Sequence, residues 1–284
     1  DWYLHAQKYN RPGDIPLKFP TEVERGCPYD CGVCPDHEQH MCLGLIDLTD
    51  DCNLACPTCF ADSKGSAYLT MDQIKAALDG FIEQEGVGAV IQFSGGEPTM
   101  HPQIVEAVKE AVDRPTEVVM INTNGIKFAQ DEDLIKRLVD VSENKLEIYL
   151  QFDGFTDEVH QKIRGAKLVD IKMKAIENML KHGLPINLAA VIQRGVNEDQ
   201  VGKIVEFGIE TKGIRGVNFQ PAFFAGRYDH DMNPMDRVTN TEIMDRLKKQ
   251  TDCKFRKTDF MPLPCSQPSE IALTYAYSKG KKVK

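Results

Sequence analysis

The stretch Cys52-Asn53-Leu54-Ala55-Cys56-Pro57-Thr58-Cys59-Phe60 places three cysteines within eight positions, shortly after the apolar run 43–48. Thiolates bind soft metals and iron–sulfur clusters well, and short spacings let one loop wrap a single inorganic core. Because a cubane [4Fe–4S] cluster has four irons, three cysteines leave one iron open for another ligand. Zinc prefers four closed ligands, usually from two separated pairs, and no second pair obviously completes this triplet. The spacing therefore favours an iron–sulfur site over a zinc knuckle or three unrelated thiols.

The composition is that of a globular protein with a sizeable core, since 42% of the 284 residues are hydrophobic and 27% are charged. This length fits one large α/β domain or two smaller ones. The net charge of −9 argues against nonspecific binding to nucleic acid. We see no apolar stretch long enough for a membrane span and no signal peptide, and we expect a cytoplasmic protein. The start at Asp1, without a methionine, suggests a fragment or a trimmed chain.

The nine cysteines are unevenly distributed: seven lie between Cys27 and Cys59, and the other two are Cys253 and Cys265. A disulfide framework is the competing interpretation. It fits poorly because the chain is large, the count is odd and the spacing is typical of metal sites. The cysteines therefore indicate metal ligation in a reducing compartment.

The stretch 27–35 repeats the cysteine spacing of the central triplet. With one more cysteine downstream, it offers a second cluster the thiols of Cys27, Cys31, Cys34 and Cys42. Alternatively, His37 or His40 is a ligand, or Cys42 is a small buried residue at the entrance of a strand.

Apolar runs and helical stripes alternate along the rest of the chain. We expect strands over 43–49, 87–93, 117–121, 146–152, 186–192 and 216–220. We expect helices from about 70 onward and over 104–112, 132–141, 169–182 and 199–211. The alternation predicts an α/β fold, a parallel βα array whose right-handed crossovers curl it into a partial (β/α)6 barrel. A doubly wound open sheet is the alternative.

Polar segments occupy the ends of the expected strands, where parallel βα folds collect their binding residues. These segments are the cysteine loop, 94–98, 122–125 and 151–154. Each alone could be a turn, but their shared placement favours a binding site. No phosphate-binding loop or dinucleotide glycine fingerprint is present.

The cysteine triplet, followed by Gly95-Gly96-Glu97-Pro98 at the second strand end, resembles the radical S-adenosylmethionine (SAM) superfamily over about 43–223. The resemblance implies that Cys52, Cys56 and Cys59 hold a [4Fe–4S] cluster whose open iron is chelated by SAM. In that family, reductive cleavage of SAM yields a 5′-deoxyadenosyl radical that abstracts hydrogen from an unactivated C–H bond of the substrate. An electron donor such as ferredoxin or flavodoxin is implied as a partner.

The same resemblance suggests which residues bind SAM. Gly95 and Gly96 would let the backbone approach the methionyl group, and Glu97 would accept hydrogen bonds from its ammonium. Asn124 and Asp153 are the suggested partners of the ribose hydroxyls.

Four further residues are candidates on the same basis. Gln151 or Arg164 would contact the SAM carboxylate or the substrate, although Arg164 could instead cap a helix. Asn197 is a candidate near the adenine, in a segment without the usual glycine-rich form. Phe60 would pack beside the adenine, or it is a plain core aromatic.

A narrower resemblance, to the archaeal tetraether synthase group and its bacterial relatives, rests on 27–40, 261–265 and 274–277. Those enzymes join the unactivated ends of lipid chains and carry auxiliary clusters. The first prediction is therefore coupling of lipid tails, with membrane association left open for access to the substrate. Apolar residues near the last strand could line a channel or close the barrel core: Phe219, Phe223 and Phe224. The alternatives are radical methylation or modification of a pterin-like small molecule and a noncatalytic iron–sulfur electron-transfer protein.

We divide the chain into an N-terminal arm with an auxiliary cluster motif (1–42), the barrel (43–225) and a C-terminal extension (226–284). Auxiliary [4Fe–4S] ligands are expected in both flanking parts. In the extension, Cys253 and Cys265 alone cannot close a cubane, and the segment 269–271 lacks the further cysteine that the group tends to carry.

Overall fold

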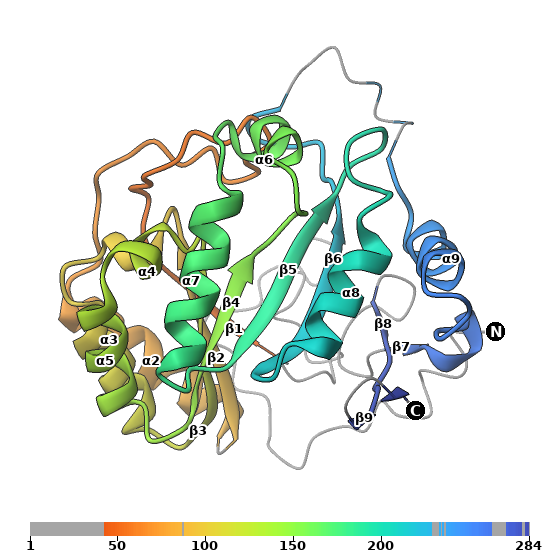
Figure 1. Ribbon diagram of the computed structural model, residues 1–284. Helices are drawn as coiled ribbons and strands as arrows, with labels where there is room; N and C mark the ends of the chain where they lie inside the picture. The colour runs from red at the N-terminus through yellow and green to blue at the C-terminus, as the bar shows by residue number, and fades with distance from the viewer. Residues whose placement is uncertain are drawn as a thin grey trace, which may run out of the picture.

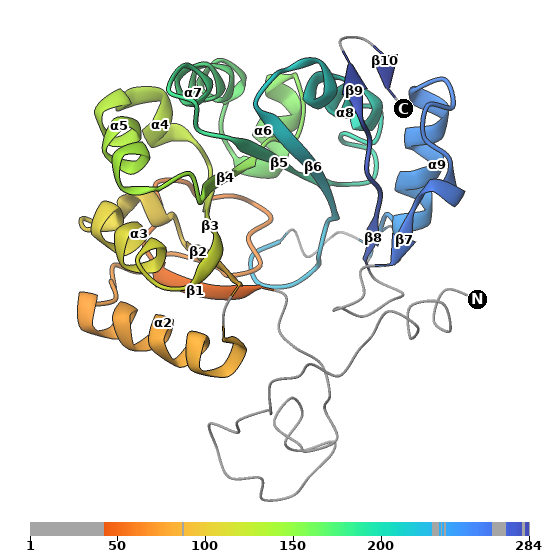
Figure 2. The ribbon, with the colours of Figure 1, turned by 90° about the horizontal axis from the view of Figure 1, so that it is seen from below.

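The computed structural model describes residues 43–86, 88–228, 233, 235, 237–262, 271–279 and 282–283. Six parallel strands form one sheet: β1 (Gly44–Thr49), β2 (Ala89–Gly95), β3 (Thr116–Thr123), β4 (Leu146–Gln151), β5 (Ile186–Ile192) and β6 (Ile214–Pro221). Each strand pairs with its neighbours in chain order, so the sheet is wound in one direction. The doubly wound alternative needs a reversal of strand order and is wrong. The partial barrel is confirmed, and Figure 2 shows the curved sheet with helices on its convex side.

The helices that follow the strands are α2 (Met71–Glu85), α3 (Ile104–Val112), α4 (Ile126–Gln130), α5 (Glu132–Val141), α6 (Asp157–Arg164), α7 (Val169–Lys181) and α8 (Val201–Glu210), with α9 (Asn240–Gln250) beyond β6 (Figure 1). The bounds predicted for α3, α5 and β5 are confirmed. The sequence prediction missed α4, α6 and α9. The first two are short, at five and eight residues, and most of α6 is polar.

Shorter elements complete the described chain. A 3-10 turn, η1 (Pro98–Met100), follows β2, and a second, η3 (Lys257–Asp259), follows α9. Near the C-terminus, β7 (Met261–Pro262) pairs with β8 (Ala272–Leu273), and β9 (Ser278–Lys279) pairs with β10 (Lys282–Val283). None of the helices in the described ranges is both long enough and apolar enough to cross a membrane.

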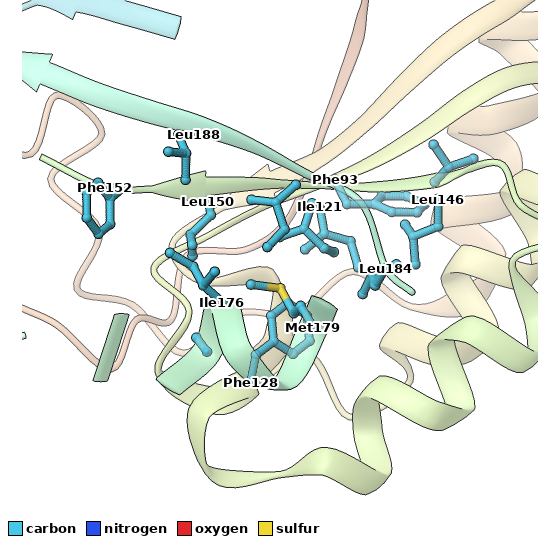
Figure 3. Close-up of a cluster of buried hydrophobic side chains, with 14 of the residues drawn as sticks. Phe93, Ile121, Phe128, Leu146, Leu150, Phe152, Ile176, Met179, Leu184 and Leu188 are labelled. Atoms are coloured by element: carbon cyan, nitrogen blue, oxygen red, sulfur yellow. The ribbon is translucent and has the colours of Figure 1, made fainter. Parts of the chain in front are cut away.

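The main core lies between the sheet and the convex-side helices. Alternate strand residues, among them Phe93, Ile121, Leu150 and Leu188, point toward α4 and α7, where Met179 meets them (Figure 3). Each such fully buried side chain contributes about 1.5–3 kcal/mol relative to an exposed one. Because strand side chains alternate between the two faces, this core fixes which residues face the concave side. It therefore positions the site.

Candidate active site

The ends of β1 and β2 pack directly against each other at the carboxyl edge of the sheet. The Gly96 amide donates to the Thr49 carbonyl at 2.7 Å, and the Glu97 amide donates to the Asp51 carbonyl at 2.8 Å. A Cβ on Gly95 would lie 2.2 Å from the Thr49 carbonyl oxygen, and Gly95 has a φ of +115°. A Cβ on Gly96 would lie 2.1 Å from the Asp51 carbonyl oxygen. Both glycines are thus required by the close approach of two strand ends, and an approach to a methionyl group stays a prediction.

The cysteine loop, residues 50–60, is also anchored on its far side. Cys59 and Arg227 exchange two backbone hydrogen bonds of 2.8 Å, which tie the loop to the segment after β6. The Thr58 hydroxyl donates to the Ile163 carbonyl at 3.2 Å, near the end of α6. The loop therefore connects the two edge strands of the open barrel, β1 and β6, across its mouth.

The three loop cysteines are free thiols, each partly exposed. Burial raises the pKa of the Cys52 thiol to about 11, a Leu54 backbone hydrogen bond opposes this, and nearby Glu97, Cys56 and Cys59 add to the rise. Within the described ranges, no three Cys, His, Asp or Glu side chains converge tightly enough to hold a single ion. A [4Fe–4S] cube is larger than one ion, so its thiol ligands stand further apart. Three soft donors on one anchored loop thus fit a cluster.

Glu97 lies buried behind this loop and accepts four hydrogen bonds. Its donors are the Thr99 amide (3.2 Å) and hydroxyl (2.6 Å), the Thr123 hydroxyl (2.7 Å) and the Asn124 amide (2.8 Å). The carboxylate therefore joins η1 to the end of β3. Its predicted contact with the SAM ammonium is not tested by this arrangement.

Asn124 connects β3 to the cysteine loop, and sequence reasoning missed its two partners. Its Nδ2 donates to Asn53 Oδ1 at 2.6 Å, and its carbonyl accepts from Lys172 Nζ at 2.5 Å. Lys172 is fully buried, and burial, followed by the Arg164 charge, lowers the pKa of its ammonium to about 7. The signal was present in α7, because Lys172 begins the stripe that continues through Ala175, Ile176 and Met179.

Asp153 and Arg164 form a buried bidentate ion pair. Arg164 Nε donates to Asp153 Oδ2 at 2.6 Å and Nη2 to Oδ1 at 2.8 Å, while the Val191 amide donates to Oδ1 at 2.9 Å. Burial opposes ionisation of Asp153, but the Arg164 charge and hydrogen bonds outweigh it and hold the pKa of the carboxyl below its usual range. Arg164 also lies close enough to Cys56 for the charges of the two groups to interact. Arg164 is the last residue of α6, yet its side chain is held by Asp153.

Asn197 is fully buried and ties β4 to β5. Its Nδ2 donates to the Asp153 carbonyl at 2.8 Å and the Val191 carbonyl at 2.7 Å, and its Oδ1 accepts from the Gln193 amide at 2.9 Å. All its polar atoms are therefore engaged by the strand ends. The predicted contact with adenine stays a prediction.

The remaining candidates are more dispersed. Gln151 is half-buried at the end of β4, and Phe60 is 75% exposed, so the core-aromatic alternative for Phe60 is wrong. Cys253 is exposed after α9. The other predicted auxiliary ligands lie outside the described residues: Cys27, Cys31, Cys34, Cys42 and Cys265.

Comparisons with known proteins identify the family. Residues 46–208 match the family model of the radical SAM superfamily. The chain is 36% identical over 274 residues to 7,8-dihydro-6-hydroxymethylpterin dimethyltransferase of Methanocaldococcus jannaschii, covering 95% of the chain and 53% of that protein. It is 25% identical over 214 residues to GTP 3′,8-cyclase of Clostridium perfringens, covering 72% of the chain and 61% of that protein. It therefore spans about half to three fifths of these relatives.

A solved structure of anSMEcpe with bound AdoMet superposes with a TM-score of 0.57 at 21% identity, over 74% of this chain and 58% of that one. At that identity the likeness shows a shared fold.

Proposed function

The chain belongs to the radical SAM superfamily, and on this premise we propose that it carries out radical-dependent methylation of a pterin-like small molecule. Enzymes of this superfamily use a [4Fe–4S] cluster and SAM, and they need a substrate and an electron donor. The observation that carries the substrate class is the 36% identity, over 95% of the chain, to a protein named for dimethylation of a dihydropterin.

When bound, the cluster and SAM supply an electron and a 5′-deoxyadenosyl radical able to take hydrogen from a C–H bond. Residues of this chain would hold the cluster in place. Cys52, Cys56 and Cys59 would ligate the cluster from a loop anchored at both ends. Arg164 would place a positive charge near Cys56 while Asp153 keeps the guanidinium in place.

The substrate ring can be described more closely. The two curated relatives are named for a pterin and for GTP. Pterin and guanine share a 2-amino-4-oxopyrimidine edge, in which a carbonyl acceptor stands beside N–H and amino donors. We propose that the substrate of this chain carries that edge.

Lipid-tail coupling, the function predicted first, has less support. Neither of these two relatives is named for a lipid. The three phenylalanines expected to line an apolar channel do not gather: Phe219 packs on the core, Phe223 is 74% exposed, and Phe224 packs edge-on against Tyr228.

The test is anaerobic reconstitution with iron, sulfide, SAM and a reductant, followed by measurement of 5′-deoxyadenosine. The methyl group would come from a second molecule of SAM, because the molecule that gives the radical leaves as methionine and 5′-deoxyadenosine, and the reductant supplies the electrons. We expect release of 5′-deoxyadenosine and, with 7,8-dihydro-6-hydroxymethylpterin present, a methylated product detected by mass spectrometry. A diether lipid is the competing substrate arm. Product from the lipid and none from the pterin would overturn the proposed substrate class, and no SAM cleavage by loaded protein would overturn the proposed radical chemistry.

A further inference from the structure

One strand level of the sheet carries polar residues across five neighbouring strands. The strand register pairs Asp47 with Ser94, Asn122 with Tyr149, and Tyr149 with Asn187. Ser94 stands opposite Asn122, because the preceding residues, Phe93 and Ile121, are paired. Asn122 Nδ2 lies 3.4 Å from the Ser94 hydroxyl oxygen. We call this set the polar row: Asp47, Ser94, Asn122, Tyr149 and Asn187.

The polar row faces the concave side of the sheet. The residues next to it along each strand, such as Leu48, Phe93 and Ile121, are buried in the convex-side core. Since side chains alternate along a strand, the row points the other way, away from the helices seen in Figure 2. All five members retain exposed surface. The row is therefore accessible from the concave side.

Hydrogen bonding in the row is incomplete at its centre. The Tyr149 hydroxyl accepts from Gln220 Nε2 at 3.1 Å, and Asn187 Nδ2 donates to Glu147 at 2.6 Å. Asn122 Nδ2 reaches Ser94 only at 3.4 Å, and Asn122 Oδ1 is buried without a partner among the described residues. A buried acceptor left unpaired costs about 1–3 kcal/mol. Asn122 thus carries an unpaired acceptor, and rotation of its carboxamide about the broad χ2 torsion would turn that acceptor toward an external N–H.

The row lies beside the cysteine loop. Asn122 is two residues before Asn124, whose side chain donates to Asn53 in that loop. Ser94 immediately precedes Gly95, which packs on Thr49 where β1 leads into the loop. A ring held at Asn122 would therefore lie under the site proposed for the radical chemistry.

We propose that Asn122, flanked by Ser94 and Tyr149, binds the 2-amino-4-oxopyrimidine edge of the substrate on the concave face of the sheet. Its carboxamide presents an acceptor and a donor side by side, which matches the adjacent N–H and carbonyl of that edge. The Ser94 and Tyr149 hydroxyls can each accept or donate and would pair the remaining groups. A few convergent polar groups of this kind fix the orientation of a small ligand. The proposal rests on the proposed function for the choice of ring.

The test is isothermal titration of the cluster-loaded, SAM-bound chain with 7,8-dihydro-6-hydroxymethylpterin and, separately, with GTP. We expect Asn122→Leu to weaken binding of the preferred probe at least about tenfold, because the edge loses both partners. The control is Gln130→Leu, an exposed amide at the end of α4, which should bind as the unchanged protein does.

The outcomes separate this site from the proposed function. Equal binding by the unchanged protein and Asn122→Leu would overturn the site and leave pterin methylation standing. Binding of GTP alone, lost in Asn122→Leu, would support the site and overturn the pterin substrate. Binding of neither probe would overturn the site. If Asn122→Leu does not fold, Tyr149→Phe carries the test: weaker binding is expected, and unchanged affinity would overturn the proposal.

Discussion

At the carboxyl edge of the sheet, Glu97, Asp153 and Asn197 are buried with their polar side-chain atoms engaged by other parts of the chain. In the polar row, Asn122 lies on β3, two residues before Asn124, and keeps a buried oxygen without a partner among the described residues. Both regions are rich in amides and carboxylates, so composition does not separate them. The difference is saturation: engaged groups hold strand ends in place, while an unengaged group has binding capacity left.

The hydrogen-bonded residues at the edge of the sheet therefore have a structural role in the fold. Asp153 and Asn197, whose predicted contacts with the cofactor stay predictions, also hold β4, β5 and α6 to one another through their hydrogen bonds. These buried residues therefore support the cysteine loop from below. We call them the frame: Glu97, Asp153, Arg164, Lys172 and Asn197. Substitutions in the frame should damage cluster loading or stability, and substitutions in the row should damage substrate binding.

The largest effect is expected at the loop itself. Cys56→Ala removes one of three thiols that would hold the cluster, so 5′-deoxyadenosine release should fall to the background of protein without iron. The measurement is chromatographic detection of 5′-deoxyadenosine after anaerobic reconstitution. Cys253→Ala is the control, since Cys253 is exposed beyond α9, and it should keep SAM cleavage. Cleavage retained by Cys56→Ala would contradict the assignment of the central loop.

The next effect concerns the buried ion pair of the frame. Arg164→Met leaves the Asp153 carboxylate buried without its partner and should lower the free energy of unfolding by about 3–5 kcal/mol. Urea unfolding of the metal-free, reduced protein measures this apart from cluster loading. The double variant Asp153→Leu, Arg164→Met should lose less than the sum of the single losses, because no charge is left unpaired.

A matched surface pair gives the control for that experiment. Lys109 and Asp113 pair at 2.7 Å on α3 with both side chains about half exposed, and Asp113→Ala should hardly move the urea midpoint. A comparable loss of unfolding free energy for Arg164→Met and Asp113→Ala would mean that the buried pair contributes no more to stability than an exposed pair.

Lys172 makes the frame sensitive to pH. A lysine in the unfolded chain has a pKa of about 10.4. In the fold, burial and, to a smaller extent, repulsion by the Arg164 charge lower the pKa of Lys172 to about 7. Between these values the unfolded chain holds the extra proton, so this group makes stability rise with pH, by up to about 1.4 kcal/mol per pH unit. Lys172→Met should lack this rise in urea unfolding measured from about pH 7 to about pH 9.5. Equal pH slopes in both proteins would contradict the lowered pKa of Lys172.

Sequence reasoning located the elements that local pattern determines. The stripes of α3 and α5 and the apolar run of β5 predicted their bounds. The cysteine loop and residues 95–98, predicted to form one site, do lie together in the fold. Local sequence patterns do not predict contacts between segments that are distant in the sequence. That Asp153 meets Arg164, or that Lys172 reaches the Asn124 carbonyl, depends on segments 11 and 48 residues apart. The polar row was likewise invisible, because it exists only through the register between strands.

The smallest effect on stability is expected in the polar row. The test makes the same change, Asn→Leu, once in the frame at Asn197 and once in the row at Asn122. Asn197→Leu breaks three hydrogen bonds of a fully buried amide and should cost at least about 1–3 kcal/mol in the free energy of unfolding. Asn122→Leu removes an amide whose only described side-chain bond is 3.4 Å long and whose oxygen is unpartnered. It should be nearly neutral or slightly stabilising, since an apolar group of similar size does not need a partner. Urea unfolding of both variants, in the metal-free chain, gives the comparison. A large loss for Asn122→Leu would show that Asn122 belongs to the frame, because a group that binds only substrate contributes nothing to folding in its absence.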